Sequence, residues 1–180
     1  MKLGYQGIEG SYSHIAAEKI IDKLKIYDVE FVGLVTSESV YENLVRGKID
    51  IGLCAISNNT AGIVTETEEV INYDKVEKIY EYELKIEHNL YARTNDFVKI
   101  VSHSQALAQC KEKIKKIYKN IETQEKKDTA IAAKELRRDE AVLCSTKAGE
   151  IYGLNLIHKN MNDNEENATK FMLFKRRNTN

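Results

Sequence analysis

The chain has 180 residues, of which 42% are hydrophobic and 31% charged, and its formal net charge is -1. That size and composition suit a globular protein that buries its own core. The near-zero charge excludes a global electrostatic field that would attract nucleic acid or a membrane surface. No apolar run reaches the ~20 residues that span a bilayer, and no signal-peptide core follows Met1. We therefore expect a cytoplasmic protein without nucleic-acid or membrane partners, with the basic residues 175–177 as a solvated segment.

The three cysteines, Cys54, Cys110 and Cys144, are odd in number and far apart, and two of them lie in apolar runs. This pattern predicts buried small hydrophobic residues rather than disulfides. No Cys-x-x-Cys or His-x-x-x-His spacing occurs in the sequence. We therefore expect no metal site.

Apolar spacing predicts alternating strands and helices along the whole chain. The first half predicts strand 2–5, helix 13–25, strand 30–35, a helix that starts at 37–39 and stops at Gly47, strand 49–56 and helix 65–72. The second half predicts an alternating strand within 80–92, strand 100–101, helix 105–118, strand 121–123, helix 128–136, strand 141–144, helix 146–152 and strand 171–174.

This alternation is typical of an α/β fold. The second series begins near Val76, and the chain returns to the first series at its end. We therefore expect two lobes with a cleft, one formed by residues 1–76 and 158–180 and the other by residues 77–157.

Two motifs follow strands of the first series. Residues 7–13 (GIEGSYS) join a strand to a helix, where glycines permit a sharp turn and helix N–H groups can bind an anion. A plain capped turn is the alternative. Residues 55–62 (AISNNTAG) place small polar side chains at the carboxyl end of a buried strand, where α/β sheets bind ligands. An Asx-rich turn is the alternative there.

A third motif, residues 101–110 (VSHSQALAQC), places Ser102 at the end of a strand and Gln105 and Gln109 one turn apart on a helix. Both amides can then face one pocket. His103 is either a titrating group or, as is more common for a single histidine, a structural hydrogen-bonding residue.

A fourth motif, residues 167–171 (NATKF), directly precedes the last strand. It places the Thr169 hydroxyl next to the Lys170 cation. A hydroxyl beside a cation suits a carboxylate ligand, although five residues alone prove nothing.

These four motifs, together with residues 128–133 (DTAIAA) and 152–154 (YGL), follow one another as in the prephenate dehydratase family. That family shows Gly-Pro-x-Gly-Thr-Phe-Ser, Pro-Ile-Glu-Asn-Ser-x-x-Gly, Ser-His-Pro-Gln…Gln-Cys, Ser-Thr-Ala-x-Ala-Ala, Tyr-Gly-Leu and Asn-x-Thr-Arg-Phe. Six ordered motifs are far more specific than any one of them. From about Lys2 to about Arg176, the sequence resembles the catalytic domain of this family.

The resemblance implies a two-lobed, periplasmic-binding-protein-like (type II) fold with the active site in the interlobe cleft. It implies one catalytic domain over residues 1–180, without the ACT regulatory domain that usually follows. The implied reaction is decarboxylating dehydration of prephenate to phenylpyruvate, CO2 and water in phenylalanine biosynthesis, with no cofactor. Family members associate, so we expect a homodimer.

The resemblance also implies roles for individual residues. Thr169 matches the family threonine that hydrogen-bonds the departing hydroxyl, and the polar residues Asn58, Ser102 and Gln109 match those that orient the substrate. The side-chain carboxylate of the substrate is expected near a cation, Lys170. The implied substrate-binding residues are Ser11, Asn59, Thr60, Ala61, Gly62, Thr129, Lys170 and Phe171.

Several positions depart from the family pattern. Lys170 stands where the family has arginine and loses the planar two-pronged fit to a carboxylate, so a return to arginine is expected to lower KM. Ser57 replaces a glutamate, Asn59 a serine or threonine, and Ser104 a proline. Asp128 replaces a serine, and its carboxylate either repels a dianionic substrate or caps its helix.

Three other functions stay open. A non-aromatising prephenate decarboxylase of a secondary-metabolite pathway resembles this fold, but such proteins tend to lack the threonine found here as Thr169. An arogenate dehydratase would use the same chemistry on an aminated substrate. A catalytically weakened carboxylate-binding homologue is the third, because fold does not settle function.

Overall fold

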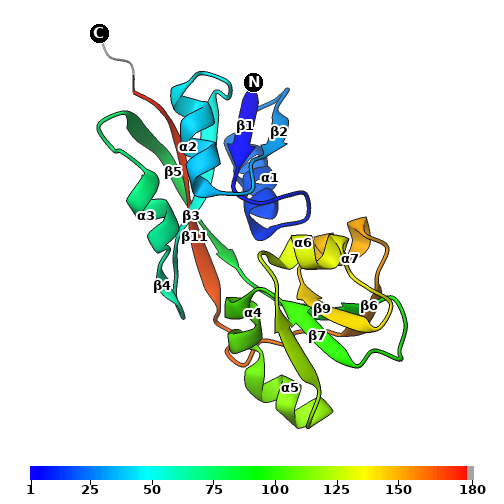
Figure 1. Ribbon diagram of the computed structural model, residues 1–180. Coiled ribbons are helices and arrows are strands. Elements are labelled where there is room, and N and C mark those ends of the chain that lie inside the picture. The colour runs from blue at the N-terminus through cyan, green and yellow to red at the C-terminus, as the bar shows by residue number, and fades with distance from the viewer. Residues whose placement is uncertain (178–180) are drawn as a thin grey trace. The chain divides into compact units, whose positions relative to one another are not determined.

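The computed structural model describes residues 1–177, which form two compact units (Figure 1). The first unit contains Met1–Ile8, Tyr12–Lys85 and residues 168–177, and the second contains Glu9–Ser11 and Ile86–Asn167. Apart from Glu9–Ser11, the chain leaves the first unit after Lys85 and returns to it at Ala168; the sequence pattern predicts these changes near Val76 and residue 158.

The first unit is built on a mixed sheet. Its strands are β1 (Lys2–Tyr5), β2 (Glu30–Gly33), β3 (Ile51–Asn58), β4 (Gly62–Ile63), β5 (Val76–Lys85) and β11 (Ala168–Arg176). They lie in the order β2-β1-β3-β11-β5, and β4 pairs with β3. Strand β1 is parallel to β2 and β3, whereas β11 is antiparallel to both β3 and β5. The last strand of the chain is thus held between two earlier ones.

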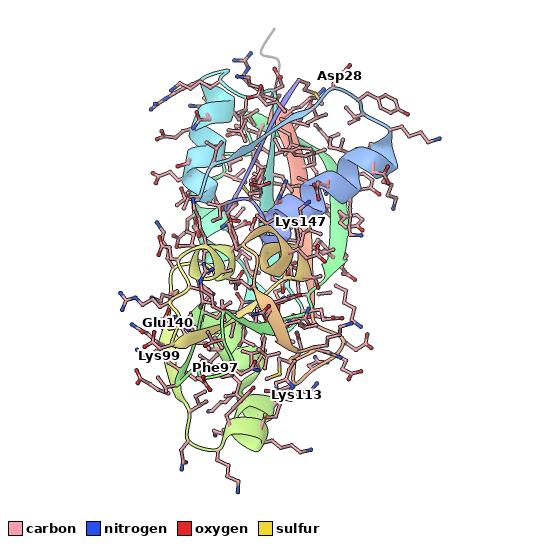
Figure 2. All side chains as sticks on the ribbon, turned by 90° about the vertical axis from the view of Figure 1, so that its right-hand side faces the viewer. Asp28, Phe97, Lys99, Lys113, Glu140 and Lys147 are labelled. Carbon is pink, nitrogen blue, oxygen red and sulfur yellow. The ribbon has the colours of Figure 1, made fainter. Side chains whose placement is uncertain are left out.

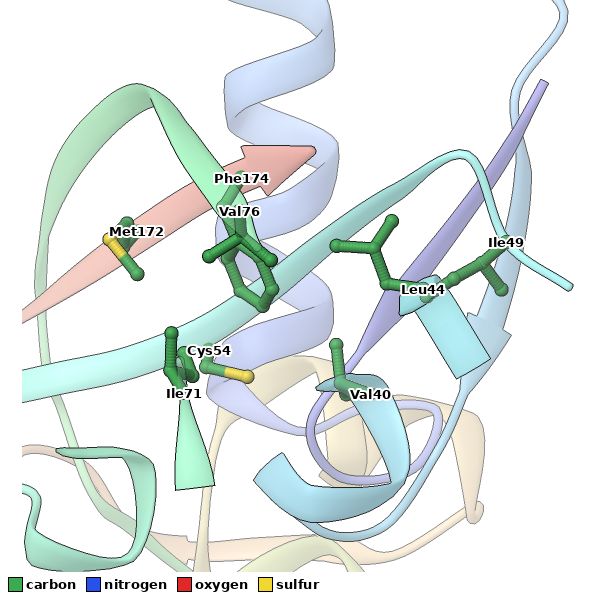
Figure 3. Packing of buried hydrophobic residues seen from close by; sticks show 8 residues of the cluster. All are labelled: Val40, Leu44, Ile49, Cys54, Ile71, Val76, Met172 and Phe174. Atoms are coloured by element: carbon green, nitrogen blue, oxygen red, sulfur yellow. The ribbon is translucent and has the colours of Figure 1, made fainter. Parts of the chain in front are cut away.

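Helices pack on both faces of this sheet. They are α1 (Tyr12–Leu24), α2 (Ser37–Val45) and α3 (Thr65–Val70). One core cluster joins Val40 and Leu44 of α2 to Cys54 of β3 and to Met172 and Phe174 of β11 (Figure 3). These apolar side chains, buried on folding, hold α2 against the sheet.

Helix α1 lies against the other face of the sheet. The Lys23 ammonium lies 5.7 Å from the ring centroid of Tyr80 and 5.9 Å from that of Tyr82, both on β5. These rings pair in register with Leu173 and Phe171. Because side chains alternate along a strand, the odd-numbered residues of β11 point toward α1 and the even-numbered ones toward α2.

The second unit has its own sheet. Its strands are β6 (Asn89–Ala92), β7 (Lys99–Ser102), β8 (Glu122–Glu125), β9 (Glu140–Cys144) and β10 (Asn155–His158), in the order β10-β6-β9-β7-β8. Strand β7 is parallel to β8 and β9, and Lys99 pairs with Glu140 in that register (Figure 2). Strand β6 is antiparallel to β9 and β10. Two sheets with covering helices confirm the α/β class.

The helices of the second unit are α4 (Ser104–Gln109), α5 (Lys111–Tyr118), α6 (Thr129–Lys134) and α7 (Thr146–Ile151). Ile114 of α5 packs with Leu90, Ile100 and Leu143 in the core of this unit. The single helix expected over 105–118 is divided at Cys110. The new helix begins there because the Asp163 carboxylate accepts hydrogen bonds from the backbone N–H groups of Glu112 and Lys113.

The alternating segment 80–92 also differs from expectation. It forms the end of β5 and the whole of β6, which belong to different sheets. The expected burial of the cysteines is confirmed, since Cys54, Cys110 and Cys144 are free thiols with 0% exposure. Among residues 1–177, no helix combines the length and the apolar character needed to cross a membrane.

Candidate active site

Asn58 and Thr169 form a side-chain pair in the first unit. They face each other across the β3–β11 ladder, and Asn58 Nδ2 donates a hydrogen bond of 2.9 Å to Thr169 Oγ1. Asn58 is buried and Thr169 half-buried. The motifs at residues 55–62 and 167–171, far apart in the sequence, therefore meet at one point of one sheet.

Hydrogen bonds to its carbonyl oxygen fix the orientation of the Asn58 carboxamide. Asn58 Oδ1 accepts from Thr60 N at 2.9 Å and from Ala61 N at 3.0 Å, and also from the Thr60 hydroxyl. The amide nitrogen must then face Thr169, whose oxygen accepts. Within residues 1–177 the Thr169 hydroxyl donates no hydrogen bond, so its hydrogen can be donated to a ligand.

A β-bulge aims Asn58 at Thr169. The register of β11 against β3 shifts between Lys170 and Phe171, which leaves Ile56 as an extra residue in β3. Ile56 packs in the cluster beneath α2. In a regular strand Asn58 would share the face of Ile56. The bulge reverses the alternation, as bulges near functional sites commonly do, and brings Asn58 to the face of Thr169.

The turn after Asn58 is tied to the beginning of β11. Asn59 N donates to Ala168 O at 3.0 Å, and Asn59 Oδ1 accepts from Ala168 N at 2.9 Å. Asn59, which replaces the serine or threonine of the family pattern, therefore links the turn to the first residue of β11. Thr60, Ala61 and Gly62 are exposed, and Gly62 has a φ of 84°, a conformation that favours glycine.

Lys170 is placed differently from its neighbour Thr169. It pairs in register with Ser57 on β3 and Glu83 on β5. Because successive side chains alternate, Lys170 leaves the strand on the face opposite Thr169. The structure therefore does not bring the Lys170 cation and the Thr169 hydroxyl together on one face, as the expected carboxylate site would require.

Two expected site residues have almost no exposed surface. The Phe171 side chain is 1% exposed, which leaves almost none of its ring open to a ligand. Ser102, at the end of β7, is 0% exposed and donates a hydrogen bond of 2.7 Å to Leu143 O on β9. The Ser102 hydroxyl hydrogen therefore links β7 to β9, and the substrate contact expected of Ser102 stays a prediction.

Asp128 caps α6. Its Oδ1 accepts from Ala130 N at 2.7 Å and from Ile131 N at 3.0 Å, an N-cap arrangement. Of the two roles considered for this carboxylate, capping is confirmed. Thr129 follows as the first residue of the helix and is 9% exposed.

The motif at residues 7–13 is divided between the two units. Ser11 belongs to the second unit and is 4% exposed. In the same unit, Ser145 Oγ donates to Gly10 O at 2.7 Å. A Cβ added at Gly10, whose φ is 87°, would lie 2.9 Å from Ala148 Cα, so glycine is needed for this close approach.

A second polar group lies in the second unit, where Gln109 ends α4. Gln109 Oε1 lies 3.0 Å from His88 Nε2 and accepts from Asn167 Nδ2 at 2.9 Å. Gln109 Nε2 in turn lies 3.4 Å from Asn167 Oδ1. Gln109 is half-buried, so the structure places this expected residue in a network of three side chains.

His88 was not anticipated as a site residue. It lies among apolar and charged residues of the alternating segment 80–92, where nothing local distinguishes it. Asn167 is the first residue of the motif at residues 167–171, but the sequence alone gave no reason to expect a role for its side chain. His103, in contrast, accepts from Gln105 N at 3.3 Å as the N-cap of α4, which confirms its structural role.

The other reactive side chains offer little chemistry. Burial raises the pKa of each cysteine thiol to about 12, so all three stay protonated and poorly nucleophilic at neutral pH. Within residues 1–177, no three histidine, cysteine, aspartate or glutamate side chains are grouped as metal ligands would be.

The family model for prephenate dehydratase matches residues 3–179. An Arabidopsis thaliana protein, arogenate dehydratase/prephenate dehydratase 2, chloroplastic, is 30% identical over 98% of this chain and 46% of its own length. The chain spans about half the length of the curated relatives it matches.

Solved structures show the same fold. A prephenate dehydratase from Arthrobacter aurescens, determined with L-Phe, superposes with a TM-score of 0.87 at 23% identity, covering 99% of this chain and 61% of that one. A periplasmic substrate-binding protein of an ABC transporter from Coxiella burnetii gives a TM-score of 0.54 at 14% identity, covering 98% and 84%. The fold is therefore of the type II periplasmic-binding-protein-like kind, and the match over residues 3–179 shows that this chain belongs to the prephenate dehydratase family.

Proposed function

We propose that the chain catalyses decarboxylating dehydration of prephenate, giving phenylpyruvate, CO2 and water. The observation that carries this proposal is the Asn58–Thr169 pair, in which the threonine oxygen accepts from an amide and its hydrogen is left for a ligand. Membership of the family supports a dehydratase, and the proposal extends that support to this particular hydroxyl.

The pair suits the chemistry of the departing group. In the reaction, the bond between the ring and its carboxylate breaks, and its electron pair enters the ring. The ring carbon–oxygen bond breaks at the opposite end, and its electron pair leaves with oxygen, which takes a proton to become water. A positioned donor speeds such a departure, commonly by about 10²–10⁴-fold.

A threonine hydroxyl is a weak acid, so we assign it hydrogen bonding with proton relay rather than full ionisation. Charge that develops on Thr169 Oγ1 as the proton moves is stabilised by the N–H of Asn58, 2.9 Å away. That donor is already oriented by the turn at Thr60 and Ala61. Pre-oriented donors of this kind need no reorganisation during the reaction.

Arogenate is the second candidate substrate. A relative that is 30% identical is described as an arogenate dehydratase/prephenate dehydratase. Arogenate carries an amine in place of the side-chain ketone, so the same bond changes would yield phenylalanine. The reacting ring is unchanged, and the Asn58–Thr169 pair therefore serves both substrates equally well.

The test compares Thr169→Val with Thr169→Ser. Valine keeps the shape of threonine without the hydroxyl, whereas serine keeps the hydroxyl. With prephenate as substrate and phenylpyruvate followed by its absorbance in alkali, we expect valine to lower kcat by about 100-fold or more and serine by less than about tenfold. Thr123→Val, on exposed strand β8 of the other unit, is the matched control and should leave kcat unchanged.

A Thr169→Val enzyme with near-normal kcat would remove Thr169 from the reaction. A non-aromatic keto acid as the product of the unaltered protein would replace the proposal by a decarboxylase. Binding of prephenate without turnover would indicate a carboxylate-binding homologue.

A further inference from the structure

His88 lies in the second unit, immediately before β6, and its position is closely fixed. Its backbone N–H donates to Asn162 Oδ1 at 2.7 Å, and its carbonyl accepts from Met161 N at 2.7 Å. The side chain is buried, with 3% of the residue exposed. The imidazole is therefore held against Gln109 by the backbone as well as by its own contact.

The contact between His88 and Gln109 is directional. Gln109 Oε1 accepts from Asn167 Nδ2 at 2.9 Å, and the same oxygen lies 3.0 Å from His88 Nε2. A carbonyl oxygen only accepts, so His88 Nε2 must carry the hydrogen. The ring is then in the Nε2–H tautomer.

Turning the Gln109 amide over would require two further changes. Its nitrogen would face both His88 Nε2 and the amide nitrogen of Asn167, which lies at 2.9 Å in the present arrangement. Asn167 would have to turn as well, and His88 would have to move its hydrogen to Nδ1. The His88 tautomer and the orientations of the Gln109 and Asn167 amides can therefore change only together.

Burial also keeps the ring neutral. The buried environment disfavours the charged imidazolium and, with the hydrogen bond to Gln109 opposing it, lowers the pKa of His88 to about 4. At neutral pH the ring therefore carries one hydrogen, and its location on Nε2 or Nδ1 decides whether the ring donates to Gln109 or accepts from it.

We propose that His88 is a positioning residue, whose Nε2–H fixes the carboxamide of Gln109, and through it Asn167, in the orientation that meets the substrate. The inference rests on the proposed function and on the substrate-orienting role that the family resemblance implies for Gln109. His88 itself acts through Gln109 and takes no part in bond breaking. In metal sites, residues that are hydrogen-bonded to the ligating side chains orient those side chains in the same indirect way.

A double-mutant cycle tests this role. His88→Leu removes the donor in an apolar form, and His88→Gln restores an N–H donor of similar reach. We expect His88→Leu to lower kcat/KM by about 10–30-fold and His88→Gln to lower it by less than about threefold. In the Gln109→Leu background, His88→Leu should lower kcat/KM by less than about twofold. An equal loss in both backgrounds, or no recovery with glutamine, would overturn the proposal.

A second measurement needs no substrate. Nitrogen-15 NMR of the histidine rings at neutral pH distinguishes Nε2–H from Nδ1–H, with His88→Gln identifying the signal. We expect the Nε2–H form of His88 in the unaltered protein. In Gln109→Leu, we expect the ring no longer to prefer that form. An Nδ1–H ring in an active enzyme would overturn the inference alone. Absence of turnover of both prephenate and arogenate would instead overturn the proposed function, and with it the catalytic part of the inference.

Discussion

At the scale of residues, the direction of one hydrogen bond decides what Thr169 can do. Because Asn58 offers an N–H, the Thr169 oxygen accepts and its hydrogen remains available to a substrate. An acceptor in place of that N–H would capture the threonine hydrogen. The chemistry of the site thus depends on which end of a carboxamide faces the hydroxyl, and the turn at residues 60–61 determines this.

Asn58→Asp should therefore abolish most activity although Thr169 is retained. Aspartate has the shape of asparagine and can still accept from Thr60 N and Ala61 N, but its second oxygen accepts the Thr169 hydrogen. We expect kcat to fall by about 30-fold or more with little change in folding. Steady-state kinetics and the thermal midpoint check both statements.

The matched control is Asn72→Asp, an Asx turn in the same unit whose Oδ1 accepts from Asp74 N at 2.9 Å. It makes the same charge change and should leave kcat unaltered. Unchanged kcat in Asn58→Asp would show that the threonine hydrogen is not needed.

At the scale of elements, β11 separates two neighbouring residues by strand alternation. Thr169 shares a face with Asn58, whereas Lys170 lies on the opposite face beside Ser57 and Glu83. The strand is regular, and the irregular residues are in its partners, Ile56 of β3 and Ile79 of β5. The sequence NATKF therefore presents a hydroxyl on one face of the sheet and a cation on the other.

This arrangement predicts that Lys170→Gln changes KM for prephenate by less than about threefold, because Lys170 lies on the face opposite Thr169. If Lys170 bound the substrate carboxylate, removing that charged hydrogen bond would raise KM by about tenfold. Lys170→Arg should likewise leave KM unchanged, in contrast to the expectation from sequence. Initial-rate measurements over a range of prephenate concentrations decide the matter. A tenfold rise in KM for the glutamine variant would show that Lys170 reaches the substrate after all.

Local patterns predicted most of these elements. Helix α1 and the buried strand β3 follow directly from apolar spacing, and capping of α6 was one of the two roles expected for the Asp128 carboxylate. The break at Cys110 was not predictable, because Asp163, whose carboxylate caps α5, is remote in sequence. Segment 80–92 keeps one alternation while it changes sheets, and no glycine or proline marks the change.

The site was predictable only in part. Thr169, Asn58 and Gln109 were found as motif residues, and the structure gives each a side-chain partner. The hydrogen bond from Ser102 to the Leu143 carbonyl was not predictable, because a hydroxyl at a strand end looks the same whether it meets a ligand or a neighbouring carbonyl. The bulge at Ile56 and the partnership of His88 are long-range properties that no local pattern reveals.

At the scale of the whole molecule, each of the two units contains its own sheet and core, and the chain passes between them at residues 8–9, 11–12, 85–86 and 167–168. One polar group lies in each unit, Asn58–Thr169 in the first and His88–Gln109–Asn167 in the second. Family membership is established over residues 3–179. Both substrates undergo the same bond changes at the ring, so the Asn58–Thr169 pair does not distinguish prephenate from arogenate.

Product analysis of the unaltered protein tests the central claim most directly. The protein would be incubated separately with prephenate and with arogenate, and the products followed by proton NMR together with the CO2 released. We expect prephenate to give aromatic phenylpyruvate and CO2 in equal amounts, with no non-aromatic acid accumulating. Release of CO2 without aromatic signals, or prephenate that is bound but unchanged, would contradict the proposed function.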